Sequence, residues 1–503
     1  MRFLKHLIQL FLLAAGLRRY GAIRALESIA EVPNWAPRLL RVFTFYIPRK
    51  FKLPASNGER LAIALAAMGP AYIKLGQTLA TRPDLVGRPL AAGLITLQDK
   101  VAAFSFAQVR RTVEAELGGT LEDHFSEFDE KPVAAASIAQ VHKATTKNGT
   151  LVAVKVLRPN IEKRFTRDLA LFEWLAALAE NHSNKAKRLR LGKIVEEIRE
   201  TVLQEMDLRL EAAAAAELAD NMAGAPNYSL PAILWDQTAQ RVLTLEWCDG
   251  IRLSDKEALE AAGHNLPALG TTIVQTFLTQ ALRDGYFHAD LHQGNLLVEH
   301  TGTIIAVDFG IMGRLTKLER RFLAEILYGF IKRDYRRVAE LHFDAGYVPQ
   351  GENLEDFTRA LKAIADPILD LPIEEISAGK LLAQLFATTE RFNMQTQPQL
   401  LLLQRTMVMA EGMALHLNPQ ANMWDISEPV IESWIRENLS PEVRLAELIN
   451  QIPRFIERLP ALLDNIINPP APAPIPEPII IKQGSSLWPF VLGLLVGAVA
   501  FIL

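Results

Sequence analysis

The most informative stretch of the chain is residues 288–310, HADLHQGNLLVEHTGTIIAVDFG. It contains an acid at Asp290, an amide five residues later at Asn295, and a second acid at Asp308. Two short apolar runs between the amide and the second acid flank Thr301-Gly302, and they predict a β-hairpin. Carboxylate and amide oxygens are the ligands that Mg2+ prefers in proteins. We therefore favour a site for metal-bound phosphate chemistry over a surface hairpin with incidental acids.

The order and spacing of these residues match the catalytic loop and the Asp-Phe-Gly element of protein kinases. On this pattern Asp290 is the predicted catalytic residue, next to the oxygen that accepts the phosphoryl group, and Asn295 and Asp308 are the predicted metal ligands. Two loop positions differ from ordinary protein kinases, because Ala289 replaces the usual arginine and His292 the usual lysine. No Ala-Pro-Glu follows Asp-Phe-Gly. These departures argue against peptide phosphorylation and against control by activation-loop phosphorylation.

The composition limits the classes of protein to which the chain can belong. With 503 residues, the chain is long enough for two or three domains. Hydrophobic residues make up 50% of it and the mean hydropathy is +0.11, which favours a membrane contribution. A formal net charge of -3 argues against a nucleic-acid partner, which a basic surplus would indicate. The single cysteine, Cys248, excludes intrachain disulfides and cysteine-built metal sites.

Residues 132–157 contain the predicted nucleotide-binding segment. The β-type runs at residues 137–145 and 151–157 flank a Lys-Asn-Gly turn, and the second run contains Val-Ala-Val-Lys, ending at Lys155. In kinases this lysine holds the α- and β-phosphates, and a glycine-rich loop precedes its strand. Three alanines occupy that loop here, so nucleotide handling should differ from that of a typical kinase. The predicted ATP-binding residues of this segment are Pro132, Val133, Ala134, Ala135, Ala136, Ser137, Ile138, Ala139, Gln140 and Lys155.

One long helix is predicted at residues 192–222, and it contains Glu205, Asp207 and Glu211. At about 100° per residue, Asp207 and Glu211 share a face, whereas Glu205 lies about 120° away from Glu211. One helix could therefore serve two cations on different sides. The alternative is three solvated acids on a helix rich in alanine and glutamate.

Residues 1–15 predict an amphipathic helix. Arg2, Lys5, His6 and Gln9 form a polar stripe at helical spacing, and the opposite face is apolar. We prefer a helix that lies on a membrane or on the protein itself to a cleaved signal peptide.

Residues 58–84 predict further helix, which Gly69-Pro70 can interrupt. Lys74, Gly76 and Gln77 form the pattern K-x-G-Q within it. Helical periodicity alone does not make this pattern a site, because a lysine and a glutamine often lie on the solvated face of a helix.

The second half of the chain predicts a strand at residues 242–247 and then mostly helix from residue 313 to about residue 460. His342 and Asp344 in this region are predicted to be structural. A proline-rich spacer follows, and residues 487–503 carry no charge for 17 residues. A helix of that length spans about 25 Å, which predicts a transmembrane anchor rather than a buried core helix.

All these motifs, in this order, resemble the UbiB (ADCK-type) family of atypical kinases, and in particular its bacterial members. The resemblance runs from Gly58 through the helical region after Asp-Phe-Gly, and it implies an α+β, bilobal, protein-kinase-like fold. It also implies that Glu211 pairs with Lys155 as a further ATP-binding residue. A lid over the active site is implied, with the residues Lys74, Gly76, Gln77, Glu205 and Asp207.

The resemblance implies an ATP-dependent atypical kinase or ATPase, with ATP and Mg2+ as cofactors, that supports or regulates aerobic ubiquinone biosynthesis. The implied partners are inner-membrane lipids and either isoprenoid ubiquinone precursors or the biosynthetic enzymes. A different class of function remains open, namely a non-catalytic, nucleotide-gated, lipid-binding scaffold. The set Lys155, Asp290, Asn295 and Asp308 discriminates between them, because a scaffold does not need it.

The expected organisation places the catalytic body in the bacterial cytoplasm, held to the inner membrane by a single-pass C-terminal anchor. The phosphoryl acceptor and the oligomeric state do not follow from the sequence. The predicted segments are a helical extension with the K-x-G-Q lid (1–110), an N-lobe (111–250), a C-lobe with a helical extension (251–465), a proline-rich linker (466–486) and a transmembrane helix (487–503).

Overall fold

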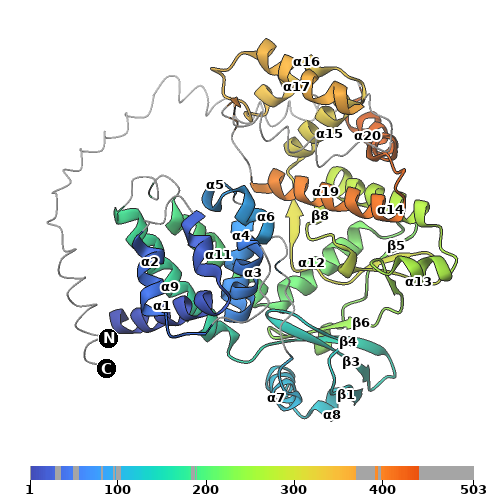
Figure 1. Ribbon diagram of the computed structural model, residues 1–503. Helices are drawn as coiled ribbons and strands as arrows, with labels where there is room; N and C mark the ends of the chain where they lie inside the picture. The colour runs from blue at the N-terminus through green and yellow to red at the C-terminus, as the bar shows by residue number, and fades with distance from the viewer. Residues whose placement is uncertain are drawn as a thin grey trace, which may run out of the picture. The chain divides into compact units, whose positions relative to one another are not determined.

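The computed structural model describes residues 2–28, 35–48, 56–80, 83–94, 97, 103–182, 187, 190–369, 391–392, 394 and 398–440. Nearly all of them belong to one compact unit that ends at Arg436 (Figure 1). The predicted linker at residues 466–486 and the predicted transmembrane helix at residues 487–503 lie outside the described residues. Within the described ranges, no helix is both long enough and apolar enough to cross a membrane.

A five-stranded antiparallel sheet forms around the predicted lysine strand. The strands follow the order β1-β3-β4-β6, and β2 pairs with β3. The β-type runs predicted at residues 137–145, 151–157 and 242–247 are confirmed to within a few residues. Gly149 takes φ +81° in the turn between β3 and β4, a conformation that glycine adopts readily. The strands are β1 (Phe125–Phe128), β2 (Ala134–Ala135), β3 (Ala139–Thr146), β4 (Leu151–Leu157) and β6 (Val242–Glu246).

One face of this sheet packs against α7 (Phe106–Leu117), which is followed by α8 (Leu121–His124). Alternation along β4 places Val152, Val154 and Val156 on that face, where all three are fully buried. The helix contributes Val109 and Val113 to the same core. Residues on both sides of residue 111 therefore pack on this sheet.

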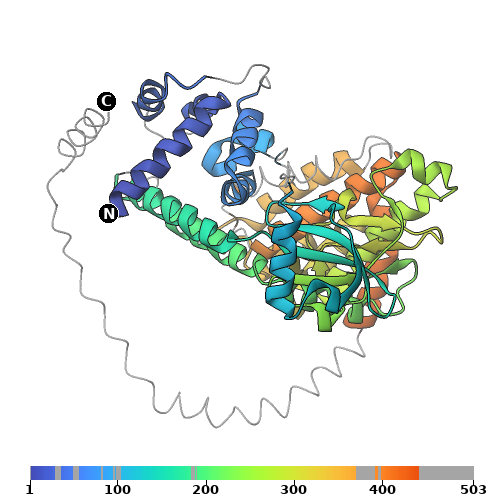
Figure 2. The same cartoon turned by 90° about the horizontal axis from the view of Figure 1, so that it is seen from below.

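The N-terminal helices form a second core, which also includes α9 (Ile161–His182) and α11 (Leu191–Glu205) from within the predicted N-lobe. Figure 2 shows these two green helices running from the blue N-terminal helices toward the strands. Buried Leu243 and Leu245 of β6 join the same core. The N-terminal elements are α1 (Arg2–Arg19), η1 (Ala22–Ser28), α2 (Trp35–Phe43), α3 (Asn57–Met68), α4 (Pro70–Ala80), α5 (Pro83–Val86) and α6 (Arg88–Leu94).

The single helix predicted at residues 192–222 is wrong. The structure has two helices, α11 and α12 (Leu208–Asn221), separated at residues 206–207. Asp207 is the N-cap of α12, and its Oδ1 accepts a hydrogen bond from the Arg209 N–H at 3.1 Å. A short acceptor side chain at the N-cap satisfies a free helix N–H and favours a helix start there. Glu205 and Glu211 therefore lie on two different helices, and the predicted angle of about 120° between them on one helix does not apply.

Helix α1 confirms the predicted amphipathic helix and packs on the protein with part of its polar stripe inward. The His6 ring stacks on Trp174 at 5.6 Å between centroids, and the Gln9 amide donates to the Arg167 carbonyl at 3.1 Å. Ile8 and Leu12 are 54% and 61% exposed. This helix therefore presents apolar side chains outward, the reverse of the usual arrangement on a water-soluble surface.

The remaining described residues form two small sheets and a set of helices. The hairpin predicted around Thr301-Gly302 is confirmed as β9 and β10, which extend into a four-stranded sheet in the order β5-β10-β9-β7. Strands β8 and β11 pair separately. The strands are β5 (Tyr228–Ser229), β7 (Ile251–Arg252), β8 (Tyr286–His288), β9 (Leu296–Val298), β10 (Ile304–Ala306) and β11 (Met312–Arg314).

The helices of this region begin with α13 and α14, and α14 continues into a π-helical turn, η3 (Gln280–Asp284), just before β8. The helical content predicted after residue 313 is confirmed for the described residues 317–369 and 398–439, and the rest of that prediction, up to about residue 460, lies largely outside the described residues. The helices are α13 (Lys256–Ala261), α14 (Leu266–Thr279), α15 (Lys317–Ile331), α16 (Tyr335–Asp344), α17 (Leu354–Leu369), α19 (Pro398–Leu417) and α20 (Met423–Leu439), with short 3-10 turns η2 (Trp235–Gln237) and η4 (Gln293–Asn295).

Buried histidines predict a pH-dependent stability. Burial lowers the pKa of His342 on α16, whose ring contacts Phe357. Burial also lowers the pKa of His142 on β3. Below the ordinary histidine pKa of about 6.5, the unfolded chain takes up protons that the native chain does not, so acid favours unfolding. We expect the free energy of unfolding to fall between pH 7 and pH 5, and His342→Phe to reduce that fall.

Urea unfolding at several pH values measures this effect. His300 is exposed, so His300→Gln serves as the control and should keep the pH dependence of the native chain. An identical pH dependence in His342→Phe would show that His342 does not contribute.

Candidate active site

Lys155 lies at the centre of a charged cluster drawn from three elements. Because Val154 and Val156 of β4 face α7, Lys155 points to the opposite side of the sheet. Its Nζ lies 2.6 Å from Glu211 Oε1, in the first turn of α12, and 3.4 Å from Asp308 Oδ1. The structure thus forms the implied Lys155–Glu211 pair and joins it to the acid of the Asp-Phe-Gly element.

The cluster keeps its charges through mutual pairing. Burial alone would lower the pKa of Lys155, but Asp308 and Glu211 outweigh it and raise that pKa. Burial opposes ionisation of Asp308, yet Lys155 and the Gly310 N–H hold the pKa of Asp308 well below its usual range. Burial raises the pKa of Glu211, and Lys155 opposes that shift. Lys155 is therefore cationic and Asp308 anionic at neutral pH.

The His288 side chain contacts the backbone of both predicted acids, Asp290 and Asp308. Its buried ring contacts the Asp308 carbonyl through Nε2, and its Nδ1 accepts the Asp290 N–H at 3.2 Å. Because a carbonyl can only accept, Nε2 carries the proton and the ring is the neutral tautomer. Burial lowers the pKa of His288, which favours this neutral state. His288 is the first residue of the stretch 288–310, but nothing in that pattern predicted a role for it.

The π-helical turn before β8 supports the same loop. Gln280, fully buried in η3, accepts the His288 N–H through Oε1 at 3.2 Å. Single π-helical turns are frequent at functional sites, because they re-aim a side chain that a regular helix would place elsewhere. Gln280 is a positioning residue that the sequence analysis missed.

Asn295 is placed to act as an oxygen ligand. Its Nδ2 donates to the Asp290 carbonyl at 3.1 Å, which leaves Oδ1 as the remaining polar atom of the amide. Its carbonyl accepts the Val307 N–H at 3.0 Å, which ties it to the residue before Asp308. Among the described residues, no three His, Cys, Asp or Glu side chains converge on one point. One carboxylate and one amide oxygen fit Mg2+, which usually completes its shell with phosphate and water oxygens.

The alanine loop is fixed by an arginine at the end of the lysine strand. Arg158 donates through Nε and Nη2 to the Ala136 carbonyl at 3.2 and 2.9 Å, and its guanidinium lies 5.5 Å from the Phe104 ring centre. The Gln140 side chain is buried against His142 and the Phe104 main chain. The Gln140 side chain therefore supports the packing under the loop.

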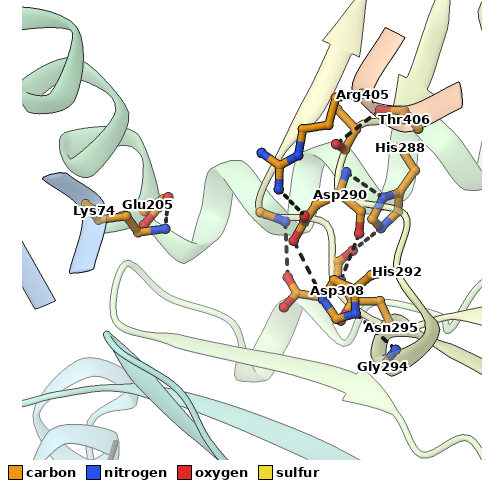
Figure 3. A network of polar contacts seen from close by, with 12 residues as sticks. Lys74, Glu205, His288, Asp290, His292, Gly294, Asn295, Asp308, Arg405 and Thr406 are labelled. Atoms are coloured by element: carbon orange, nitrogen blue, oxygen red, sulfur yellow. Dashed lines mark hydrogen bonds and ion pairs between the residues drawn. The ribbon is translucent and has the colours of Figure 1, made fainter. Parts of the chain in front are cut away.

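Two of the implied lid residues form one ion pair. Lys74 on α4 pairs with Glu205 at 2.7 Å, and both side chains are largely buried. Asp207 instead pairs with Arg209 at 2.7 Å. Figure 3 shows the Lys74–Glu205 pair to one side of the Asp290 and Asp308 cluster, and no drawn contact joins the two.

The two other lid residues lie on the same helix. Gly76 is buried on α4, where an added Cβ would come within 2.8 Å of Leu65 and Leu97, so this glycine permits close packing. Gln77 follows it and is half-buried.

Asp290 contacts two cations or potential cations. Arg405 Nη2 on α19 lies 3.4 Å from its Oδ1, and His292 Nε2 lies 3.8 Å from its Oδ2 (Figure 3). The hydroxyl of Thr406, next to Arg405, lies 3.2 Å from the Ala289 carbonyl and 2.9 Å from the Leu402 carbonyl, and it can donate to either. No local motif could have revealed Arg405, because it lies 115 residues after Asp290.

A strand lysine paired with a helix carboxylate, together with a catalytic-loop acid and an Asp-Phe-Gly acid, defines the protein-kinase-like class. Comparison with known proteins agrees. Residues 96–342 match the ABC1 atypical kinase-like domain, and residues 361–422 match the UbiB helical domain. The chain belongs to the UbiB family of atypical kinase-like proteins.

Curated bacterial relatives carry the description "Probable protein kinase UbiB". The one from Pseudomonas paraeruginosa is 40% identical over 96% of this chain and 91% of its own length. The one from Marinobacter nauticus is 40% identical over 85% and 79%, respectively. A solved Mycobacterium tuberculosis protein, described in complex with erythromycin, is 23% identical, with a TM-score of 0.53 over 73% of this chain and 93% of that one. That likeness supports the kinase-like fold alone.

Proposed function

We propose that the chain is an ATP-dependent atypical kinase or ATPase that supports aerobic ubiquinone biosynthesis at the cytoplasmic face of the bacterial inner membrane. The observation that carries the proposal is the Lys155, Glu211 and Asp308 cluster beside Asp290 and Asn295. A non-catalytic scaffold has no need of a catalytic-loop acid beside this cluster. Family membership supports the link to ubiquinone.

Each residue has one task in this proposal. Lys155 binds the α- and β-phosphates of ATP, and Glu211 keeps its ammonium in place. Asp308 and Asn295 hold Mg2+, which neutralises charge on the phosphates when bound. Asp290 orients the acceptor hydroxyl and takes its proton.

A strain that lacks this protein tests the biological role. Its lipid extract should contain less ubiquinone and an accumulated isoprenoid precursor, and the native chain should restore ubiquinone, whereas Asp290→Asn should not. Full restoration by Asp290→Asn would favour the scaffold function, because the chemistry would then be unnecessary.

Peptide substrates are expected to be poor. Ala289 and His292 replace the usual loop cations, and family resemblance implies a lid on α4, whose Lys74 forms an ion pair with Glu205. An acceptor that cannot align with the γ-phosphate is not phosphorylated, whatever the chemistry of Asp290. We expect measurable ATP hydrolysis and negligible labelling of added casein or myelin basic protein. Strong labelling of these proteins by the unmodified chain would contradict the lid.

Membrane attachment is proposed to involve both ends of the chain. The apolar residues 487–503 are the main anchor, and Ile8 and Leu12 of α1 present exposed apolar side chains. Residues 1–53 carry ten lysines and arginines against two acids, which favours an anionic lipid surface.

Deleting residues 487–503 should move the protein from the membrane fraction toward the soluble fraction, because it removes the longest uncharged segment of that region. Fractionation of cells that express the full and shortened chains measures this. A shortened chain that stays wholly in the membrane fraction would assign attachment to α1, and Leu12→Asn should then release it.

A further inference from the structure

We infer that Arg405, from the helical domain, is a positioning residue of the active site, and that it supplies the fixed positive charge that the catalytic loop lacks. This inference rests on the proposed function. It starts from the 3.4 Å contact between Arg405 Nη2 and Asp290 Oδ1. Figure 3 shows Arg405 reaching from α19 to the carboxylate of Asp290.

The loop itself offers no permanent cation next to Asp290. Ala289 has no charge, and the His292 Nε2 lies 3.8 Å from Asp290 Oδ2, beyond hydrogen-bond distance. The other His292 nitrogen, Nδ1, accepts the Gly294 N–H at 3.0 Å. An arginine, in contrast, stays charged at all relevant pH values and has five donors in a rigid fork.

The backbone of α19 is held in register with the catalytic loop. Thr406 is fully buried, and its hydroxyl lies between two carbonyl acceptors, Leu402 of its own helix at 2.9 Å and Ala289, one residue before Asp290, at 3.2 Å. Further along, α19 packs so closely on α14 that a Cβ added at Gly270 would lie 3.3 Å from Ala414 Cα. Since α14 leads through η3 into β8, the helix that carries Arg405 and the strand that precedes Asp290 share one support.

The ion pair suits the transfer step. The acceptor oxygen forms a bond to the γ-phosphorus, the bond to ADP breaks, and the acceptor proton moves to Asp290. Arg405 exchanges no proton. It contacts Oδ1, fixes the rotation of the Asp290 carboxylate and thereby leaves Oδ2 to take the acceptor proton. The helical domain would thereby be required for turnover, whereas the phosphates of the nucleotide are assigned to Lys155, which Arg405 does not support.

Arg405→Met tests the inference, with Arg436→Met as the control, because Arg436 is an exposed arginine at the end of the same compact unit. Magnesium-dependent phosphate release and nucleotide affinity are measured on the full chain, with Asp290→Asn alongside. We expect Arg405→Met to lower kcat on the order of 100-fold, the cost of misplacing a catalytic group. The nucleotide Kd of Arg405→Met should stay within about twofold of the native value. In Arg436→Met, both kcat and the nucleotide Kd should stay within about twofold of the native values.

Arg405→Lys distinguishes a positioning role of Arg405 from an effect on protein stability alone. It keeps the charge but loses the fork, so it should recover part of kcat. A native kcat in Arg405→Met would overturn the inference while leaving the proposed function intact. Equal losses in Arg405→Met and Arg405→Lys, accompanied by a lower unfolding temperature in both, would also overturn it, because the residue would then act on stability. If Asp290→Asn released phosphate as fast as the native chain, that result would instead reject the proposed function.

Discussion

Asp308→Asn is expected to abolish magnesium-dependent ATP binding or turnover. The substitution keeps the shape of the side chain and removes the one carboxylate assigned to the metal. Lys155 keeps Glu211 at 2.6 Å, so the charged cluster and the fold should survive. A metal ion contributes several kcal/mol of charge stabilisation in such sites, which corresponds to a loss of about 1,000-fold or more in turnover.

Calorimetric titration with ATP, with and without Mg2+, measures the binding part of this effect. Asp344 is exposed and lies outside the active site, so Asp344→Asn is the matched control and should behave as the native chain does. Unchanged affinity and unchanged hydrolysis in Asp308→Asn would remove Asp308 from the metal site.

Asp290→Asn should have a different effect, because its role is at the acceptor oxygen. The amide cannot take a proton, so turnover should fall by about 100-fold to 10,000-fold, the usual contribution of a general base. ATP binding should be nearly unchanged, since Lys155, Glu211 and Asp308 lie elsewhere in the site. Single-turnover kinetics separates the two constants. A large loss of ATP affinity in Asp290→Asn would mean that this residue binds the nucleotide or its metal.

The parts of the site that were predictable from the sequence are those whose signals are local. Asp290, Asn295 and Asp308 lie within one stretch whose strands and turn follow from alternation and from Gly302. Lys155 was predictable because one short strand carries its whole motif. In both cases the side chains are placed by regular β-strands or by the turn between them. Alternating hydrophobicity in the sequence predicts such strands directly.

Other features depend on contacts between distant segments. The break between α11 and α12 was missed because Glu205, Asp207 and their alanine-rich surroundings fit one continuous helix, and a cap signal within such a run is weak. Arg405 was missed because nothing near it in sequence marks it, and only tertiary packing brings it to Asp290. The outward apolar face of α1 was also unpredictable, since His6 faces the protein through its stacking on Trp174, which is distant in sequence.

The most direct test of the central claim is the rate of inorganic phosphate release from magnesium ATP by the full chain in phospholipid vesicles, compared with Asp290→Asn prepared in the same way. We expect the native chain to release phosphate and the variant to fall at least about 100-fold below it, with equal ATP binding by the two proteins. Equal rates of release in the two proteins would contradict the account, because ATP turnover would then not depend on the predicted catalytic residue.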